Sequence, residues 1–275
     1  MKVTTTPRRP TSNLNSRRFA RAQLTLVEHA LCPLSTSVSL KKNFTHETCC
    51  YFTDKHRNRC KARAQIGGLD GMSAYDEVYL WGLLAIALSQ PEPKPDLMAT
   101  PYYCLRQLGI ISNNKVGSRE FELFRAAVKR LAGMRYQNSA FYDPIRGEHR
   151  DISFGFLNYS LPLDPASSRM WRFAWDPIFF ELTQATGGTL SFDLSLYREF
   201  DPATRRLYLY LKKIFWRYPY TGQIDLHHCV RYPIAETLDF TYGFHLTYWT
   251  SRTVLKTAIS IYIHELVVSA VIHRS

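Results

Sequence analysis

The order of elements along the sequence predicts an α+β fold built around a winged helix-turn-helix. Three observations carry this prediction: a first helical segment is followed by two more, a short polar turn joins these two, and two strand-like runs come directly after them. The first helix is expected between Ser73, which suits the N-cap position, and Leu88, with apolar residues at helical spacing throughout. Pro91, Pro93 and Pro95 then end this helix.

The next two helices are bounded by residues typical of helix ends. Thr100 and Pro101 begin the second helix as cap and first helical residue, and Gly109 ends it. Residues 112–117 form a polar turn, after which Ser118 begins the third helix. The apolar positions of this third helix recur at spacings of three and four: Phe121, Phe124, Val128 and Leu131.

A β-hairpin is predicted after the third helix, and we interpret it as the wing. Its strands are Met134–Tyr142 and Ile152–Tyr159, and residues 143–150 form a polar tip with proline and glycine. The rest of the pattern predicts a strand at Met170–Trp175, a short helix from Pro177 to Thr186, an extended segment at Leu190–Leu196, a long helix from Pro202 and a last helix at Ser251–Val268.

Charge divides the chain into parts. Residues 1–68 hold 13 Lys or Arg against 3 Asp or Glu, whereas residues 69–275 hold 22 against 20. Because residues 1–68 show no helical or strand period, we expect a basic, disordered tail. Residues 69–198 are expected to form the first winged-helix domain. Residues 199–275 are expected to hold a linking helix and part of a second winged-helix domain that is divergent or truncated.

The overall charge indicates a polyanionic partner. The formal net charge is +12 and the isoelectric point about 9.5, which favours nucleic acid. Six scattered cysteines and a polar, basic start without an apolar core segment are typical of a cytosolic protein, so we expect a cytoplasmic location. The longest apolar stretch, Thr253–Ile272, is interrupted by Lys256, His264 and Glu265, so no membrane span is expected.

The third helix is the candidate recognition helix. At about 100° per residue, its apolar residues lie on one side, and the opposite side carries Arg119, Glu122, Ala126, Lys129 and Arg130. Ser118 and Arg119 lie at the helix start, and Arg119 is the candidate for base readout because arginine can donate two hydrogen bonds to guanine. Lys129 and Arg130 are candidates for phosphate contacts. An ordinary solvated helix face, or a dimerisation role, remains the alternative.

Other basic groups extend the predicted DNA-binding surface. The wing tip supplies phosphate-type contacts from Arg146, His149 and Arg150. The long helix from Pro202 interleaves basic and apolar residues, so one face can pack while the other lies along a backbone; a core helix with a solvated basic face is the alternative. The candidate DNA-binding residues of this helix are Arg205, Arg206, Lys212 and Lys213. The predicted last helix adds Arg252 and Lys256.

Several segments resemble plasmid replication initiator proteins of the replication initiator protein A type. LDGMSAYDEVYLWGLLAIAL, the LRQLGI turn and SREFELFRAAVKRLAGMRYQNSAFYD are similar to the first winged-helix domain of this family, and DLSLYREFDPATRRLYLYLKKIFWR to its linking helix. The resemblance covers residues 69–217. It implies two winged-helix domains, the second often reading DNA while the first pairs subunits. It also implies binding to repeats (iterons) at a plasmid origin, melting of adjacent DNA, recruitment of host replication initiator and helicase, and autorepression as a homodimer.

No catalytic or metal-binding signature stands out, so we expect neither an enzyme nor a cofactor. A nicking enzyme would need two histidines separated by one apolar residue, to hold a metal ion that activates the phosphate for attack by a tyrosine such as Tyr210. The only neighbouring histidines, His227 and His228, have no residue between them and so do not form this motif. Gly187-Gly188-Thr189 lacks the lysine of a phosphate-binding loop. The possible ligands His46, Cys49, Cys50, His56 and Cys60 fit no standard zinc spacing.

Taken together, the sequence predicts sequence-specific binding of double-stranded DNA at a plasmid origin to initiate DNA replication. A winged-helix transcriptional repressor is the alternative, because its folded core would look the same. A dimerisation module with a nonspecific basic tail is a third possibility.

Overall fold

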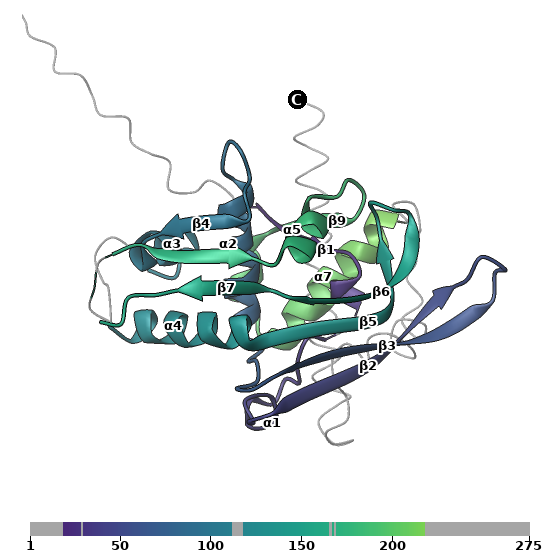
Figure 1. Cartoon of the computed structure of the whole chain (residues 1–275), viewed down its shortest axis with the longest axis horizontal. Coiled ribbons are helices and arrows are strands. Elements are labelled where there is room, and N and C mark those ends of the chain that lie inside the picture. The colour runs from purple at the N-terminus through teal and green to yellow at the C-terminus, as the bar shows by residue number, and fades with distance from the viewer. Residues whose placement is uncertain (1–18, 29, 112–117, 165–166, 168, 218–275) are drawn as a thin grey trace, which may run out of the picture.

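The chain folds into helices and antiparallel strands, which confirms the predicted α+β class (Figure 1). A computed structural model describes residues 19–28, 30–111, 118–164, 167 and 169–217. The strands are β1 (Phe19–Gln23), β2 (Phe44–Thr53), β3 (Arg59–Gly68), β4 (Asp96–Ala99), β5 (Met134–Asp143), β6 (Glu148–Gly155), β7 (Leu157–Ser160), β8 (Trp171–Trp175) and β9 (Thr189–Asp193). The helices are η1 (Leu26–Glu28), α1 (Thr36–Ser39), α2 (Asp76–Leu88), α3 (Pro101–Gln107), α4 (Ser118–Gly133), α5 (Pro177–Gln184), α6 (Leu194–Glu199) and α7 (Pro202–Arg217).

α2 is the central helix of the core. Ten of its thirteen residues are buried, because its side chains are largely apolar all round the helix and it contacts β1, α3, α4 and α6 on different sides. The regular helix begins at Asp76, with Tyr75 at the N-cap position, and Ser73 caps the turn before it by accepting the N–H of Tyr75 on its Oγ atom at 3.2 Å. Ser73 also donates its backbone N–H to Asp76 Oδ2 at 2.8 Å, the reciprocal hydrogen bond of a capping box.

Three short strands, β4, β7 and β8, form a sheet of their own. β8 pairs with β4 on one side and β7 on the other, both antiparallel, and β8 confirms the strand predicted at Met170–Trp175. The start of α3 is also as predicted, since Thr100 Oγ1 accepts the N–H of Tyr103 at 3.2 Å and Pro101 is the first helical residue. The predicted turn at residues 112–117 lies outside the described residues.

The hairpin predicted after the third helix is present as β5 and β6, but it belongs to another sheet. β5 pairs with β3, which gives a four-stranded sheet in the order β2-β3-β5-β6. The turn forms because Asp143 Oδ1 accepts the N–H groups of Ile145 and Arg146, and Gly147 adopts a φ of 70°. The hairpin that the sequence predicts as the wing therefore lies in a different sheet from β4, β7 and β8.

The prediction of a disordered tail over residues 1–68 is wrong for the described residues from Phe19 onward. β1 pairs with β9, and β2 and β3 pair over ten residues each. The inward positions of β3 are Ala62, Ala64 and Ile66, all buried. Alanine contributes little to a hydrophobic period, so the alternation typical of a strand is weak in the sequence. Residues 1–18 lie outside the described part.

α7 packs on the same body as the preceding elements. It contacts η1, α6 and β9, so residues far apart in the chain meet along this helix. The segment predicted to be extended at Leu190–Leu196 is a strand only to Asp193 and then becomes α6, whose first N–H groups are capped by the Asp193 carboxylate. The second winged-helix domain and the helix at Ser251–Val268 fall in residues 218–275, outside the described part.

Among the described helices, none is both long enough and apolar enough to cross a membrane.

Candidate nucleic-acid interface

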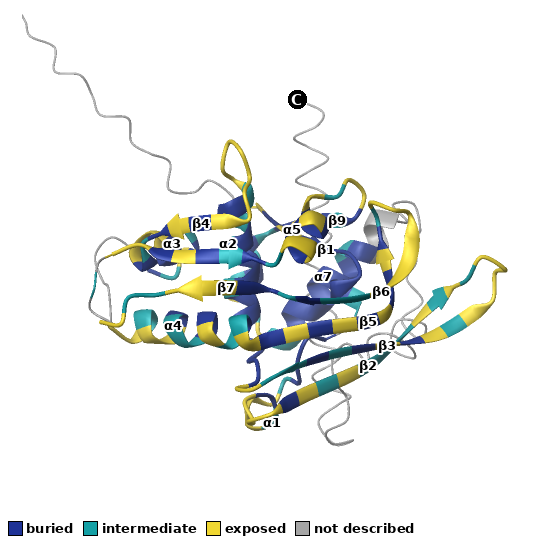
Figure 2. Ribbon diagram, viewed as in Figure 1, coloured by how far each residue is buried: buried dark blue, intermediate teal, exposed yellow. Residues whose placement is uncertain are grey.

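α4 has one packed face and one exposed face, as the sequence predicted (Figure 2). Phe124 is fully buried, with its ring centroid 5.2 Å from that of Trp171 and 5.3 Å from that of Tyr79. Val128 and Leu131 are also buried. Ser118, Arg119, Glu122 and Lys129 are exposed, and Ala126 and Phe121 are half-buried. The exposed face therefore offers two cations at different ends of the helix.

Arg130, predicted as a phosphate contact, lies at the edge of this exposed face and is paired with a carboxylate of α2. Its Nε and Nη2 atoms each donate a 2.7 Å hydrogen bond to the carboxylate of Asp76. These hydrogen bonds raise the pKa of Arg130. The Asp76 side chain is only 2% exposed, and a buried carboxylate requires a partner of this kind. Arg130 therefore fastens α4 to α2.

Arg125 is a structural residue of α4 that the sequence did not single out. Its Nη2 atom donates a 2.7 Å hydrogen bond to the carbonyl oxygen of Pro162, just after β7. Its guanidinium carbon also lies 5.9 Å from the ring centroid of Trp171 in β8. Arg125 thus ties α4 to both strands of the β7–β8 hairpin.

The tip of the β5–β6 hairpin is a set of ion pairs rather than a cationic patch. Arg146 Nη1 donates to Asp143 Oδ2 at 2.9 Å, and Arg150 Nη1 lies 3.9 Å from the same oxygen. Arg150 Nε also lies 3.7 Å from Glu148. Both predicted phosphate contacts therefore already face carboxylates, which lowers the local positive potential.

His149 of the same hairpin packs against two aromatic rings in tilted and edge-on geometry. Its ring centroid lies 4.9 Å from that of Phe52 and 5.4 Å from that of Tyr142. Partial burial lowers the pKa of His149 from its ordinary value of 6.5. The imidazole is therefore mainly neutral at pH 7, so the charge expected for a phosphate contact is missing.

Three cations of α7 that were candidates for a DNA-binding face, Arg205, Arg206 and Lys213, are buried inside the protein. Arg205 donates to the carbonyl oxygens of Tyr197 at 3.0 Å and Arg198 at 2.8 Å. Lys213 donates to the carbonyl oxygen of Leu24 at 2.9 Å and pairs with Glu28. Arg205 thus binds the preceding helix α6, whereas Lys213 joins α7 to the N-terminal segment.

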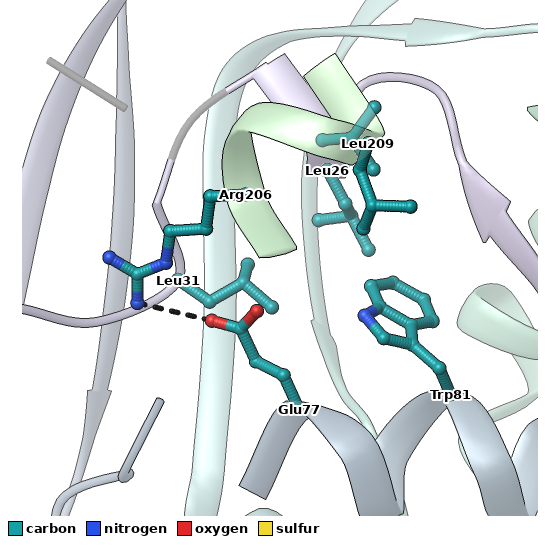
Figure 3. A pocket seen from close by; sticks show the side chains of 7 residues that line it. Leu26, Leu31, Glu77, Trp81, Arg206 and Leu209 are labelled. Carbon is teal, nitrogen blue, oxygen red and sulfur yellow. Dashed lines mark hydrogen bonds and ion pairs between the residues drawn. The ribbon is translucent and has the colours of Figure 1, made fainter. Parts of the chain in front are cut away.

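Arg206 is the third buried cation of α7 (Figure 3). Its Nη2 atom lies 3.1 Å from Glu77 Oε1, and both side chains are less than 10% exposed. Tyr197 donates its hydroxyl to the other oxygen of Glu77 at 3.2 Å. The same Nη2 atom also lies 3.3 Å from Cys32 Sγ. Burial raises the pKa of Cys32 to about 12, so this residue remains a neutral thiol.

A small cavity lies beside this ion pair. Its volume is about 20 Å³ and its lining includes Leu26, Trp81 and Leu209 (Figure 3), which is room for about one water molecule. Such a cavity is too small for a nucleotide or a cofactor. The Glu77–Arg206 pair is therefore part of how α7 docks.

The remaining predicted site residues are less buried or lie elsewhere. Lys212 is half-buried, and its Nζ atom lies 5.4 Å from the ring centroid of Tyr208 one turn earlier on α7. Arg252 and Lys256 lie outside the described residues. Of the predicted DNA-binding residues, the structure thus brings Ser118, Arg119 and Lys129 together on one exposed helix face.

The described residues do not gather a metal site: no group of three or more His, Cys, Asp or Glu side chains there could hold an ion. This includes His46, Cys49, Cys50, His56 and Cys60, which lie on or between β2 and β3.

Comparisons with known proteins give a limited result. No model of a known protein family matches the chain, and no curated protein matches it. The chain is similar in structure to domains 2 and 3 of RctB. One crystal structure of these domains has a TM-score of 0.47 at 14% identity, over 80% of this chain and 85% of that one. A second has a TM-score of 0.41 at 14% identity, over 72% and 70%. Similarity at this level does not establish a shared function.

The structure also reveals a row of exposed cations that the sequence prediction missed. Arg59, Lys61 and Arg63 occupy alternate positions of β3, and Lys55 and Arg57 continue the row into the turn before it. All five residues are exposed. The signal was present in the sequence, since these residues follow one another at every second position.

Proposed function

We propose that α2, β4, α3, α4, β7 and β8 form a winged helix-turn-helix that binds double-stranded DNA in a sequence-specific manner. The order of these elements along the chain and the pairing order β4-β8-β7 support this proposal. In this arrangement α4 is the recognition helix. The wing is formed by strands β7 and β8, and the β5–β6 hairpin is an insertion between the recognition helix and these strands.

The observation that carries this proposal is the exposed face of α4 opposite its packed face. Arg119 lies in the first turn, the part of a recognition helix that reaches base edges, and its guanidinium can donate two hydrogen bonds to a guanine. Lys129 lies about 15 Å farther along the helix, at about 1.5 Å per residue, where a phosphate contact would fix the orientation of the protein on the duplex. Arg125 supports this face by fixing α4 to the wing strands.

The biological role that we propose is initiation of replication at a plasmid origin. The resemblance of residues 69–217 to plasmid replication initiator proteins supports this role. In such a role the protein would bind repeats at the origin, recruit the host replication initiator and helicase, and repress its own promoter as a homodimer.

Footprinting on DNA upstream of the gene tests the DNA-binding proposal. We expect the full chain to protect direct repeats. Arg119→Ala is expected to relax the preference at one base pair of each repeat by about 1–3 kcal/mol. Unchanged protection and unchanged base preference in this variant would remove α4 from the readout role and direct attention to residues 218–275.

A winged-helix transcriptional repressor is the second candidate, because the same α4 face would serve it equally well. Plasmid retention separates the two functions. A plasmid whose sole origin is the protected DNA should replicate in cells that make this protein and be lost from cells that do not. If the plasmid never replicates while a reporter behind the same DNA is repressed, the protein is a repressor.

A further inference from the structure

β2 and β3 extend beyond the sheet to which they belong (Figure 1). The two strands pair with each other from Phe44 and Gly68 to Thr53 and Arg59, whereas β3 pairs with β5 only from Ala64 onward. Residues 49–63 therefore form a two-stranded ribbon that projects from the body, and this is the segment called the ribbon below. A ribbon of two strands adds little to a hydrophobic core, so its length calls for another explanation.

The ribbon concentrates positive charge. It contains five basic residues, Lys55, Arg57, Arg59, Lys61 and Arg63, and one acidic residue, Asp54, which gives a formal charge of +4. The Asp54 carboxylate is committed to the turn, since its Oδ1 atom accepts the N–H groups of His56 and Asn58 at 2.8 Å each. These hydrogen bonds lower the pKa of Asp54, and the bond from the N–H of Asn58 has the largest effect.

The basic residues of β3 share one face of the ribbon. Alternate residues of a strand are about 6.6 Å apart along its axis, which places Arg59, Lys61 and Arg63 in a line. The neighbour of Arg59 on this face is Tyr51, whose ring centroid lies 4.3 Å from the guanidinium carbon. Arg63 pairs with Glu47, but both partners are exposed and such a pair exchanges readily with another anion.

The spacing of these cations suits a linear polyanion. Each strand of duplex DNA carries one phosphate per about 3.4 Å of helix axis. Because the strand also winds around the axis, consecutive phosphates lie about 6–7 Å apart along the backbone, so cations about 6.6 Å apart can meet successive phosphates. Gly68 pairs with Met134, directly after α4, and the nine residues back to Arg59 span about 30 Å. The ribbon therefore extends away from the C-terminal end of α4, the end that carries Lys129, while Arg119 lies at the other end of this helix.

We propose that the ribbon binds the sugar–phosphate backbone of duplex DNA without reading its sequence, beyond the C-terminal end of α4 and away from the bases that Arg119 contacts. The inference deepens the proposed function by adding a second contact with the same partner. Because a backbone contact is independent of sequence, it can be measured on duplexes of arbitrary sequence, where base readout by α4 contributes nothing.

The test compares two triple variants of the full chain with equal charge changes. The ribbon variant carries Lys55→Gln, Arg57→Asn and Lys61→Gln; asparagine is used at Arg57 because this residue has a φ of 65°, which asparagine tolerates. The control variant neutralises three exposed lysines away from the ribbon, with Lys41→Gln, Lys42→Gln and Lys94→Gln. Binding to a duplex of arbitrary sequence is measured over a series of salt concentrations, with a single strand of the same sequence as a second probe.

We expect the ribbon variant to bind the duplex at least about tenfold more weakly than the control variant at low salt. The slope of log K against log salt should become shallower by about 2–3, because each lost phosphate contact removes about 0.9 from it. Equal affinities and slopes for the two variants would overturn the inference. A loss confined to the single strand would also overturn it, since the ribbon would then bind another form of DNA.

The inference and the proposed function can fail separately. If the unaltered chain shows no preference among duplex sequences while the ribbon variant still loses affinity, the ribbon binds DNA but sequence-specific recognition by α4 is refuted. If the chain prefers one sequence and the ribbon variant behaves like the control, α4 recognition stands and the ribbon inference is refuted.

Discussion

Arg130 of α4 donates two hydrogen bonds of 2.7 Å to the buried carboxylate of Asp76 at the start of α2. Asp76 in turn accepts the backbone N–H of Ser73. The pair therefore joins the turn before α2, the central helix and the candidate recognition helix. Since α4 must be held in one orientation to present Arg119 and Lys129, Arg130 supports the interface without belonging to it.

Breaking this pair should destabilise the protein. Arg130→Gln leaves the Asp76 carboxylate buried without its charged partner, and we expect the free energy of unfolding to fall by about 3 kcal/mol or more. Lys129→Gln, one residue earlier and exposed, should change it by less than about 0.5 kcal/mol. Urea unfolding of both variants checks the difference, and equal stabilities would show that the ion pair contributes nothing.

The Glu77–Arg206 pair should behave as a coupled unit that holds α7. Arg206→Met leaves a buried carboxylate and is expected to lower the free energy of unfolding by about 3–5 kcal/mol. Adding Glu77→Leu should recover much of this loss, because an apolar pair of similar volume has no buried charge. A double-mutant cycle by chemical denaturation measures the coupling. Additive effects of the two substitutions would contradict this account.

Substituting alanine for glycine at two helical positions should change the stability of the protein in opposite directions. A Cβ at Gly82 would lie 2.6 Å from Leu108 Cγ, where α2 packs against α3, so Gly82→Ala is expected to cost about 1–3 kcal/mol. A Cβ at Gly133 would meet no described atom within 4 Å, so Gly133→Ala should be neutral or stabilise by up to about 1 kcal/mol. Thermal unfolding of both variants tests this prediction. If Gly82→Ala is as stable as the unaltered chain, α3 does not pack against α2 as closely as in this structure.

The turn of the β5–β6 hairpin should lose stability in acid. Burial alone would raise the pKa of Asp143, but hydrogen bonds from Arg146 and from the N–H of Ile145 outweigh this and hold the pKa below its ordinary value of 3.8. A carboxyl whose pKa is depressed by folding stabilises the protein above its unfolded value, and this contribution is lost as the pH falls through the folded value. The stability difference between the unaltered chain and Asp143→Asn should therefore be constant from about pH 5 to 7 and shrink below about pH 3.8. A difference that persists unchanged to about pH 2 would contradict the assignment.

The faces of α4 could be predicted from the sequence because they depend on local periodicity. Phe124, Val128 and Leu131 recur every three or four residues, and these are the positions that became buried. Arg130 could not be placed in the same way, because its partner Asp76 lies 54 residues earlier and no local pattern links them. The same applies to Arg206, whose partner Glu77 lies 129 residues away.

The sheet to which the β5–β6 hairpin belongs, and β3 itself, could not be predicted from the sequence, for two different physical reasons. The turn at Asp143 and Gly147 predicted the β5–β6 hairpin correctly, but which strand a hairpin pairs with is a tertiary property, and here it is β3. β3 itself was missed because its inward residues, Ala62 and Ala64 among them, are too small to give a clear strand period. The alternation of Arg59, Lys61 and Arg63 is the remaining sign of a strand in this segment, but basic residues are equally typical of a disordered tail.

The most direct test of the account is selection of bound sequences from a pool of random DNA duplexes, carried out with the full chain and with Arg119→Ala. The account predicts that the full chain enriches one sequence motif. It further predicts that Arg119→Ala enriches the same motif with one base pair no longer specified, while the variant unfolds at the same denaturant concentration. Enrichment of an identical motif by both proteins, with the same preference at every position, would contradict recognition through α4.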